Sequence, residues 1–306
     1  MAKDIIIGID AGTSILKVVA FTLNGKEIAS SSKKNIYKTS HGGQATQSLD
    51  ATWKNCIKII SELKNKINNF KDRVAIISVT GQGDGTWLID KKGKPVCDAW
   101  LWLDSRSSDI AKKLSKLNSE KLRFDLTGTG IFAGQQSSQI SYMDKNNPEI
   151  LDQSSTAFHC KDWIYFKLTN VRATDPSEAC FTFGNFRTRQ YDENVIDGLG
   201  LTKRKNLLPD IIDGSKVTHP LSDNVATLIG LNSGTPIALG YIDAVCTFLG
   251  SGGLDINKDV GNSILGTTGG HMKATEVSQI VPNSNLKSGY IMLLPIENLA
   301  LQFQTN

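Results

Sequence analysis

Cysteine is scarce and scattered in this 306-residue chain, which argues against two kinds of site. The five cysteines, Cys56, Cys97, Cys160, Cys180 and Cys246, are odd in number and form no CxxC pair. We therefore expect neither a disulfide framework nor a cysteine-based zinc site, and a reduced, cytoplasmic protein fits best. The four histidines are isolated from one another in sequence, which does not favour a metal cluster.

Long apolar runs are also missing. No basic N-terminus leads into an apolar stretch, and no window approaches the ~18 apolar residues that a membrane span requires. We expect a cytosolic protein without membrane contact. The formal charge of +4 is spread along the chain, and residues 54–71 interleave lysines with apolar residues as on a solvated helix face. This pattern does not favour nucleic-acid binding.

The beginning of the chain predicts antiparallel strands. Residues 5–9 and 16–23 read as two strands joined by a tight turn, and Asn24-Gly25 signals a hairpin to a third strand, KEIASSSKK. A hydrophobic content of 40% with 21% charged residues describes an ordinary globular protein. At this length, two domains, or one domain and part of another, are expected.

A helix and a buried strand follow. Residues 50–69 place apolar side chains at helical spacing, with Asp50 as the expected N-cap. Residues 73–80, RVAIISVT, form a nearly continuous apolar run, as in a strand buried on both faces. The polar, glycine-rich loop GQGDG comes next. Because α/β folds place ligands at such strand ends, we expect a binding site here.

Two turns combine glycine with hydroxyl side chains. The first, Asp10-Ala11-Gly12-Thr13-Ser14, interrupts a run of Ile and Val, and the second, Gly-Thr-Thr-Gly, separates two strand-like stretches near the end of the chain. Glycine lets backbone N–H groups approach an anion closely, and hydroxyl groups add further donors. Neither GxxxxGK[ST] nor GxGxxG occurs, so P-loop and Rossmann dinucleotide sites are not the candidates. The candidate phosphate-binding residues are Gly12, Thr13, Ser14, Gly266, Thr267 and Thr268.

Asp10 is the candidate metal residue. It ends the first predicted strand and is expected to be buried. Mg²⁺ prefers oxygen ligands and keeps much of its hydration shell, so a carboxylate here can hold the ion through water. The alternative, from these residues alone, is an ordinary hairpin turn that satisfies its own backbone.

Six separated motifs occur in the order seen in the FGGY carbohydrate kinases: IIIGIDAGTS, GQGDGTWLID, AWLWLDSRS, DWIYFKLTN with TDPSEA, GTPIALGYIDA and SILGTTG. The chain resembles this family from residue 5 to about residue 275, and within it the polyol (erythritol-type) and pentulose kinases most. The resemblance implies an α/β, actin-like (ribonuclease H-like) ATPase fold, a mixed sheet with flanking helices. It also implies that the first domain binds the sugar and that ATP, with Mg²⁺, is held between two domains.

The resemblance assigns the catalytic base to Asp243, in the stretch Gly-Tyr-Ile-Asp. A carboxylate in reach of the attacking hydroxyl can accept its proton during phosphoryl transfer. From the residues alone, the alternative for Asp243 is an N-cap of the helix that follows, a role that is compatible with the catalytic one. The loop Gln82-Gly83-Asp84 matches the segment with which the family recognises its sugar. A carboxylate can accept hydrogen bonds from two hydroxyl groups, and an amide offers both a donor and an acceptor. An Asx-type turn is the alternative for Asp84.

By its match to the family, Trp102 would pack its ring against the carbon backbone of the bound polyol. Trp87 and Trp100 are expected in the core instead. Asp104 and Arg106 match the Asp-x-Arg pattern that follows this tryptophan in the family and are interpreted as an ion pair that fixes the loop, with direct substrate contact as the alternative.

The family's adenosine-binding motif has no counterpart here, so we expect a fragment. We divide the chain into an N-terminal sugar-binding domain, 1–253, and the incomplete beginning of a C-terminal ATP-binding domain, 254–306. About fifty residues are close to the size at which a domain needs a partner. They are expected to pack on the first domain, to be partly disordered, or to pair with another copy in a homodimer.

The predicted activity is transfer of the γ-phosphoryl group of MgATP, in line, to a hydroxyl of a small polyol or ketose, with an erythritol-like substrate favoured. This chain alone is expected to be inactive or weakly active. Two alternatives stay open: a non-catalytic sugar-binding or regulatory fragment, and an actin-like nucleotide switch. A switch of that kind would lack the sugar site formed by the Asp84 loop and Asp243.

Overall fold

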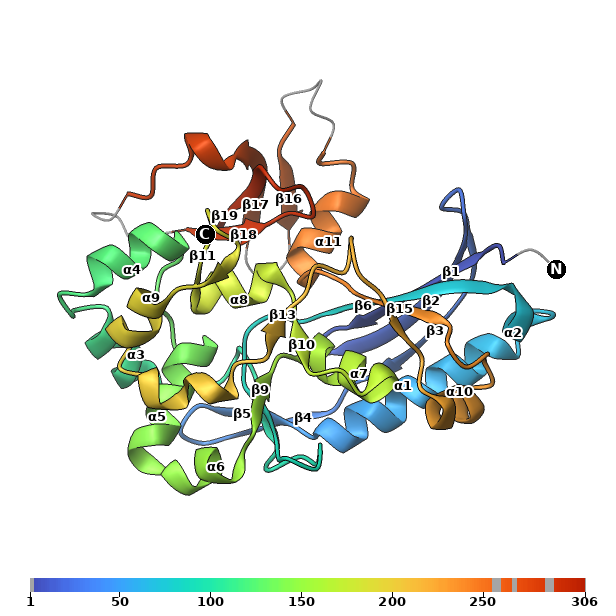
Figure 1. The fold of residues 1–306 in the computed structure, drawn as a ribbon, viewed down its shortest axis with the longest axis horizontal. Helices are drawn as coiled ribbons and strands as arrows, with labels where there is room; N and C mark the ends of the chain where they lie inside the picture. Colours follow the sequence, from blue (N-terminus) through green and yellow to red (C-terminus); the bar gives the residue numbers. More distant parts are fainter. Residues whose placement is uncertain (1–2, 255–259, 266–268, 284–288, 306) are drawn as a thin grey trace.

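The centre of the molecule is a six-stranded mixed sheet (Figure 1). The structure is a computed structural model, and it describes residues 3–254, 260–265, 269–283 and 289–305. In the sheet, β1, β6 and β15 run parallel, while β2, β3 and β14 are antiparallel to their neighbours. The strands in sheet order are β14 (His219–Pro220), β15 (Pro236–Leu239), β6 (Val74–Gly81), β1 (Ile5–Ala11), β2 (Ile15–Thr22) and β3 (Glu27–Lys34).

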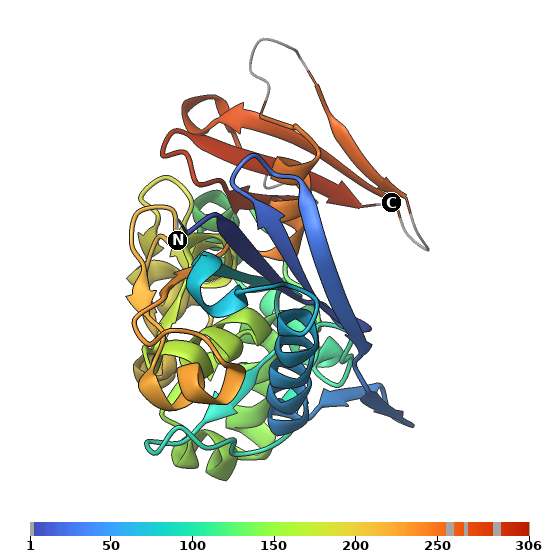
Figure 2. The same ribbon diagram turned by 90° about the vertical axis from the view of Figure 1, so that its right-hand side faces the viewer.

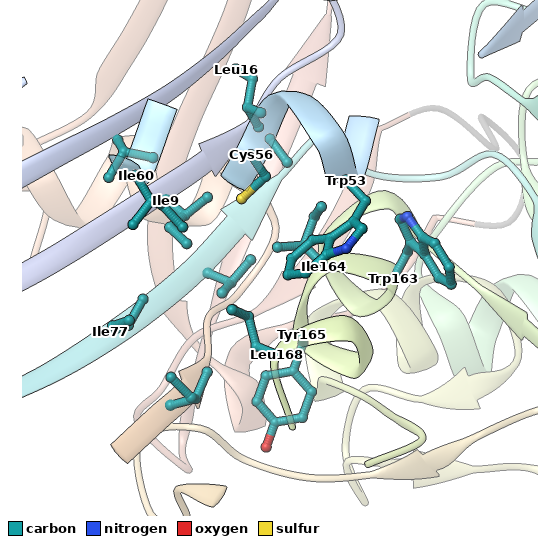
Figure 3. Close-up of a cluster of buried hydrophobic side chains, with 14 of the residues drawn as sticks. Ile9, Leu16, Trp53, Cys56, Ile60, Ile77, Trp163, Ile164, Tyr165 and Leu168 are labelled. Carbon is teal, nitrogen blue, oxygen red and sulfur yellow. The ribbon is translucent and has the colours of Figure 1, made fainter. Parts of the chain in front are cut away.

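One face of this sheet carries the main core. Side chains of β1, β2 and β6 meet those of α1 (Leu49–Lys64) and α7 (Cys160–Thr169) (Figure 3). Helix α10 (Asp223–Ile229) packs beside α1. Burial of one such large apolar side chain contributes roughly 1.5–3 kcal/mol. The strand predicted over 73–80 is confirmed as β6, but burial on both faces is wrong. Every second residue toward its end is only half-buried, because α1 and α7 cover one face.

The helix predicted within 50–69 is confirmed as α1, but it ends at Lys64, and its N-cap is Ser48 and not Asp50. Ser48 has an extended backbone and its hydroxyl accepts a hydrogen bond from the N–H of Ala51 at 3.3 Å, which is the geometry of a cap. Asp50 lies inside the first turn, where its negative charge complements the helix dipole.

Smaller elements surround the sheet and carry the loops discussed below. Short strands pair as β4 (Tyr37–Ser40), β5 (Gln44–Gln47) and β8 (Ala99–Trp100); β7 (Trp87–Ile89) and β9 (Thr156–Phe158); β10 (Ala173–Thr174) and β13 (Asp210–Ile211); and β11 (Gly184–Asn185) and β12 (Gln190–Tyr191). The remaining helices of this part are α2 (Phe70–Arg73), α3 (Ser108–Leu114), α4 (Glu120–Thr127), α5 (Gln136–Asn146), α6 (Pro148–Gln153), α8 (Pro176–Thr182), α9 (Glu193–Gly198) and the 3₁₀ helix Thr202–Leu207.

The last part of the chain forms a separate antiparallel sheet, drawn in orange and red in Figures 1 and 2. Its order is β16 (Asn262–Leu265), β17 (Gly269–Glu276), β19 (Leu299–Thr305) and β18 (Tyr290–Leu293), with a 3₁₀ turn at Val277–Gln279. It follows α11 (Asp243–Gly250).

This second sheet shares a core with the first part of the chain. Met272, Met292 and Leu301 pack with Phe181 of α8 and Phe248 of α11. The described residues after 253 therefore pack on the first domain, which is one of the expected outcomes for so short a segment. The domain boundary at 253 stays a prediction. Within the described ranges, no helix combines the length and the apolar character that crossing a bilayer would demand.

Candidate active site

Three parallel strands end side by side, and each is followed by one of the predicted site segments. Ala11 at the end of β1 pairs with Gly81 at the end of β6, and Leu239 at the end of β15 pairs with Val79. The N–H of Gln82 donates to the carbonyl of Ala11 at 3.1 Å. The turn after β1, the loop after β6 and the turn before Asp243 therefore lie at one edge of the sheet, where α/β folds bind ligands.

The turn after β1 leaves no room for a side chain at Gly12. A Cβ there would lie 2.8 Å from the carbonyl oxygen of Ile15, a separation that real Cβ atoms essentially never show. Asn35, just after β3, fixes this turn: its Nδ2 donates to the Gly12 carbonyl at 2.7 Å, and its N–H donates to the Ser14 carbonyl at 2.9 Å. Sequence reasoning missed Asn35, because no local pattern identifies a residue of another strand as a partner of the turn.

The hydroxyl of Thr13 connects this turn to the predicted polyol loop. Its Oγ1 donates to Gln82 Oε1 at 2.9 Å and accepts from Trp102 Nε1 at 3.0 Å. Gln82 is in turn held by Gln47, whose Oε1 accepts from Gln82 Nε2 at 3.1 Å. Trp102 is 45% exposed, so its ring is accessible to a ligand, whereas Trp87 and Trp100 are buried as predicted.

The loop after β6 has an unusual backbone. Asp84 is only 7% exposed and has a left-handed backbone with φ of +53°, and Gly85 follows with φ of +72°. The Asp84 N–H donates to Glu178 Oε2 at 3.3 Å. Among the described residues, nothing donates a hydrogen bond to Asp84 Oδ1, so the Asx turn considered as an alternative is not formed through that atom. Burial, followed by the negative charge of Asp243, raises the pKa of Asp84 well above its usual range.

Asp243 is the first residue of α11, and Ile242 occupies the N-cap position, so the capping role considered for Asp243 is wrong. Because Ile242 precedes the helix, the Asp243 carboxylate lies in the first turn of α11. There Oδ1 accepts from the N–H of Ala244 at 2.7 Å. Burial and the nearby negative charge of Asp10 raise the pKa of Asp243 to about 7. A carboxyl group with such a pKa is matched to proton transfer near neutral pH.

Asp10 is exposed, and the expectation that it is buried is wrong. Side chains alternate along β1: Ile7, Ile9 and Ala11 point into the core, and Asp10 points away from it. An exposed carboxylate remains accessible to a hydrated cation. Within the described residues, no group of three or more His, Cys, Asp or Glu side chains gathers as a metal site.

The Asp104–Arg106 ion pair is present and fixes the loop beside Trp102. Asp104 is fully buried, accepts from the Ala45 N–H at 2.9 Å, and lies 2.6 Å from Arg106 Nη2. The Arg106 guanidinium also stacks on Trp100, 3.3 Å from the ring centre. The Asp104 carboxylate also accepts from the Arg106 N–H, so its hydrogen bonds join this loop to Ala45, which agrees with a loop-fixing role.

The second predicted phosphate turn, with Gly266, Thr267 and Thr268, lies outside the described residues. The strands expected on either side of it are confirmed as β16 and β17, which pair antiparallel. Two further residues near the site went unrecognised in the sequence. Ser177 Oγ accepts from the Ile242 N–H at 3.1 Å, and Glu178 holds Asp84 as described above. Both belong to the TDPSEA motif, to which no role was assigned.

Comparison with known proteins identifies the family of this chain. The profile of the FGGY family of carbohydrate kinases, N-terminal domain, matches residues 5–250. The chain is 51% identical to the erythritol kinase of Brucella abortus (strain 2308) over 303 residues, covering 99% of this chain and 58% of that protein. It is 25% identical to the L-xylulose/3-keto-L-gulonate kinase of Escherichia coli (strain K12), covering 85% of this chain and 52% of that protein. The chain thus spans little more than half the length of these relatives.

Solved structures show the same fold. The ligand-bound xylulose kinase from Lactobacillus acidophilus superposes with a TM-score of 0.87 at 23% identity, covering 99% of this chain and 59% of that one. The glycerol kinase of Plasmodium falciparum with ADP gives a TM-score of 0.82 at 20% identity, covering 99% of this chain and 61% of that one. These likenesses confirm the α/β, actin-like fold with its mixed sheet. The chain belongs to the FGGY family of carbohydrate kinases.

Proposed function

We propose that the protein carrying this chain uses ATP to phosphorylate a small polyol, with erythritol or a close analogue as substrate. The observation that carries the proposal is the convergence of the Asp10 turn, the Asp84 loop and Asp243 at the ends of three parallel strands. The 51% identity to an erythritol kinase supports the choice of polyol.

The turn after β1 fits a phosphate group. Gly12 allows the tight turn, because a Cβ there would meet the Ile15 carbonyl oxygen, and the hydroxyl groups of Thr13 and Ser14 would add donors to the backbone N–H groups of the turn. ATP, when bound, supplies the γ-phosphoryl group that is transferred, and its Mg²⁺ balances the phosphate charge. Asp10 would hold that Mg²⁺ through water, which suits an ion that binds to few carboxylates and keeps several waters.

The loop after β6 would bind the polyol. Asp84 has a buried carboxylate oxygen without a donor among the described residues, and a pair of polyol hydroxyl groups can satisfy it. Gln82 and Gly83 would shape the same surface, and the exposed ring of Trp102 would cover the carbon chain of the substrate. A buried unsatisfied carboxylate is costly, so hydroxyl donors that meet it should bind favourably.

Asp243 would act as the general base. Its Oδ1 already accepts from the Ala244 N–H, so we assign Oδ2 as the atom that takes the proton. As the substrate oxygen bonds to the γ-phosphorus, the bond from that phosphorus to the bridging oxygen breaks, ADP leaves, and the hydroxyl proton moves to Asp243. The partly dehydrated carboxylate, with its raised pKa, can keep that proton at neutral pH.

The test is a coupled ADP-release assay on the complete encoded protein, with erythritol, xylitol, xylulose, ribulose and glycerol compared. We expect erythritol to give the highest kcat/KM. Asp243→Asn should lower kcat by about 10²-fold or more while the protein still binds erythritol in a thermal-shift assay. Erythritol binding without ADP release in the wild-type protein would instead favour a sugar-binding, non-catalytic protein. ADP release that no polyol stimulates would favour a nucleotide switch.

A further inference from the structure

Two consecutive residues of α8 accept hydrogen bonds from the backbone at or next to the two predicted site aspartates, Asp84 and Asp243. Ser177 Oγ accepts from the N–H of Ile242, the residue directly before Asp243, at 3.1 Å. Glu178 Oε2 accepts from the N–H of Asp84 at 3.3 Å. Both side chains are fully buried, so solvent does not compete for these hydrogen bonds. The first turn of α8 therefore contacts the backbone of the polyol loop and of the residue before the base at the same time.

The space between the two loops is tightly filled. A Cβ on Gly83 would lie 1.9 Å from Ile242 Cδ1 and 3.2 Å from Glu178 Oε1, so Gly83 is pressed between these two side chains. Asp84, next to it, has a left-handed backbone that a residue other than glycine adopts only when its surroundings hold it there. The hydrogen bond to Glu178 is the contact that fixes its N–H.

Glu178 is itself fixed by a buried charge network. His159 lies between two carboxylates, with Nδ1 3.0 Å from Asp162 Oδ2 and Nε2 3.6 Å from Glu178 Oε2. Lys161 Nζ lies 2.6 Å from Asp162 Oδ1 and 2.6 Å from Asp175 Oδ1. Burial alone would lower the pKa of His159, but the Glu178 and Asp162 carboxylates outweigh that effect and raise it. Burial also raises the pKa of Glu178, to about 8, against the lowering effect of the His159 and Lys161 charges.

The charge network also includes the N-cap of α8. Asp175 is the N-cap of α8, where its side chain accepts from the Ser177 N–H at 2.7 Å, and Lys161 links it back to the first turn of α7. Because α7 packs on β6 and β15, the start of α8 is anchored to the same strands that end at the site. A rigid support of this kind is what a binding site needs to hold its groups in productive geometry.

We propose that Ser177 and Glu178 are positioning residues, which set the polyol-binding Asp84 and the base Asp243 relative to each other through the hydrogen bonds they accept. This inference rests on the proposed kinase function. Glu178 acts through Asp84, so removing the Glu178 carboxylate should weaken polyol binding. Ser177 acts through the residue before Asp243, so removing the Ser177 hydroxyl should slow the chemical step.

The experiment is steady-state kinetics on the complete encoded protein with erythritol and ATP. Glu178→Met fills the same space without an acceptor and should raise the KM for erythritol about tenfold, the usual effect of one lost hydrogen bond to a buried group. Glu178→Gln keeps an acceptor oxygen and should remain within about threefold of the wild-type KM. The KM for ATP should stay within about twofold in both.

Ser177→Ala should lower kcat about tenfold and leave the erythritol KM within about threefold, the reverse of the Glu178→Met pattern. Two matched controls lie away from the site. Ser154→Ala removes a buried hydroxyl that donates to the Ile150 carbonyl, and Glu120→Met removes a buried carboxylate paired with Arg123. Both controls should lower the melting temperature without changing either kinetic constant.

Kinetic constants of Ser177→Ala and Glu178→Met that match those of the controls, measured where thermal melts show all variants folded, would overturn the inference. The inference would also be overturned if both variants showed the same fall in kcat and the same rise in the KM for erythritol. If Glu178→Met does not fold, Ser177→Ala against Ser154→Ala decides the question alone. A wild-type protein that phosphorylates no polyol would refute the proposed function, a result that is distinct from an active wild type with unaffected variants.

Discussion

The hydroxyl of Thr13, in the predicted phosphate turn, donates a hydrogen bond to Oε1 of Gln82, in the predicted polyol loop, at 2.9 Å. The same hydroxyl accepts from Trp102 Nε1. The hydroxyl that would donate to a phosphate oxygen is thus directed at the predicted polyol loop. Occupation of one site is therefore expected to change the hydrogen bonding of the other.

Replacing Thr13 tests this coupling. Thr13→Val keeps the shape and removes the hydroxyl, so we expect the KM values for ATP and for erythritol both to rise, by roughly three- to tenfold. Thr13→Ser keeps the hydroxyl and should stay close to wild type. In a double-mutant cycle with Gln82→Leu, the two effects should be non-additive, because each variant removes the same contact. Additive effects would show that the two loops act independently.

The raised pKa of Asp243 predicts how activity depends on pH. A base must be ionised to accept a proton, and the pKa of Asp243 is about 7. The kcat/KM for erythritol should therefore fall about tenfold for each pH unit below 7 and level off above it. The measurement is a pH profile between pH 5 and 9, with Asp243→Asn as the control that removes this limb. A wild-type profile that stays flat down to about pH 5 would exclude Asp243 as the base.

The raised pKa of Asp243 also predicts that the protein becomes less stable as the pH rises. The Asp243 pKa is about 7 in the folded protein, against an ordinary value of 3.8, so the folded state holds this proton more tightly than the unfolded state. Stability due to this group is therefore present below about pH 4 and is lost as the pH rises to about 7. Asp243→Asn should accordingly gain in melting temperature over wild type at pH 8 but not at pH 4. A difference that does not change with pH would contradict the assignment.

The local features of the site could be predicted from the sequence, and the long-range ones could not. The strands and the loops after them follow from apolar runs broken by glycine, which are patterns within a few residues of one another. Asp243 and Asp84 were identified by family resemblance together with such patterns. In contrast, Glu178 reaches Asp84 over a separation of 94 residues, and only the packing of α8 brings them together.

Burial was the other property that sequence patterns predicted poorly. Asp10 was expected inside because it ends a buried strand, yet side chains alternate and only one face of β1 is fully covered. The same uncovered face explains why β6 is less buried than its apolar run suggests. Which face of a strand is covered depends on where the helices pack, and that is a property of the whole fold.

Asn35 offers a test that separates the two ligands. Asn35→Asp replaces the Nδ2 donor to the Gly12 carbonyl by an oxygen, so the turn loses one of its two fixed contacts. We expect the KM for ATP to rise about three- to tenfold and the KM for erythritol to change less than twofold. Asn24→Asp, at an exposed hairpin, is the matched control and should leave both unchanged. A larger effect on erythritol than on ATP would argue against a phosphate role for this turn.

The close approach of Gly83 to Ile242 predicts that the loss of activity from one substitution can be partly reversed by a second substitution. A Cβ at this position would lie 1.9 Å from Cδ1 and 2.6 Å from Cγ1 of Ile242, so Gly83→Ala must push the loop or the turn before Asp243 out of place. We expect at least a roughly tenfold loss of kcat/KM for erythritol, since small displacements of positioned groups are costly in catalysis.

Ile242→Ala removes both of the crowding atoms, so the double variant Gly83→Ala/Ile242→Ala should recover part of the lost kcat/KM relative to Gly83→Ala alone. Gly250→Ala is the matched control: it lies at the end of α11, where a Cβ meets nothing within 4 Å, and it should leave kcat/KM unchanged. If the double variant is no better than Gly83→Ala, the loss comes from the loop backbone and not from contact with Ile242. Recovery would show directly that the polyol loop and the turn carrying the base are held in place by packing against each other.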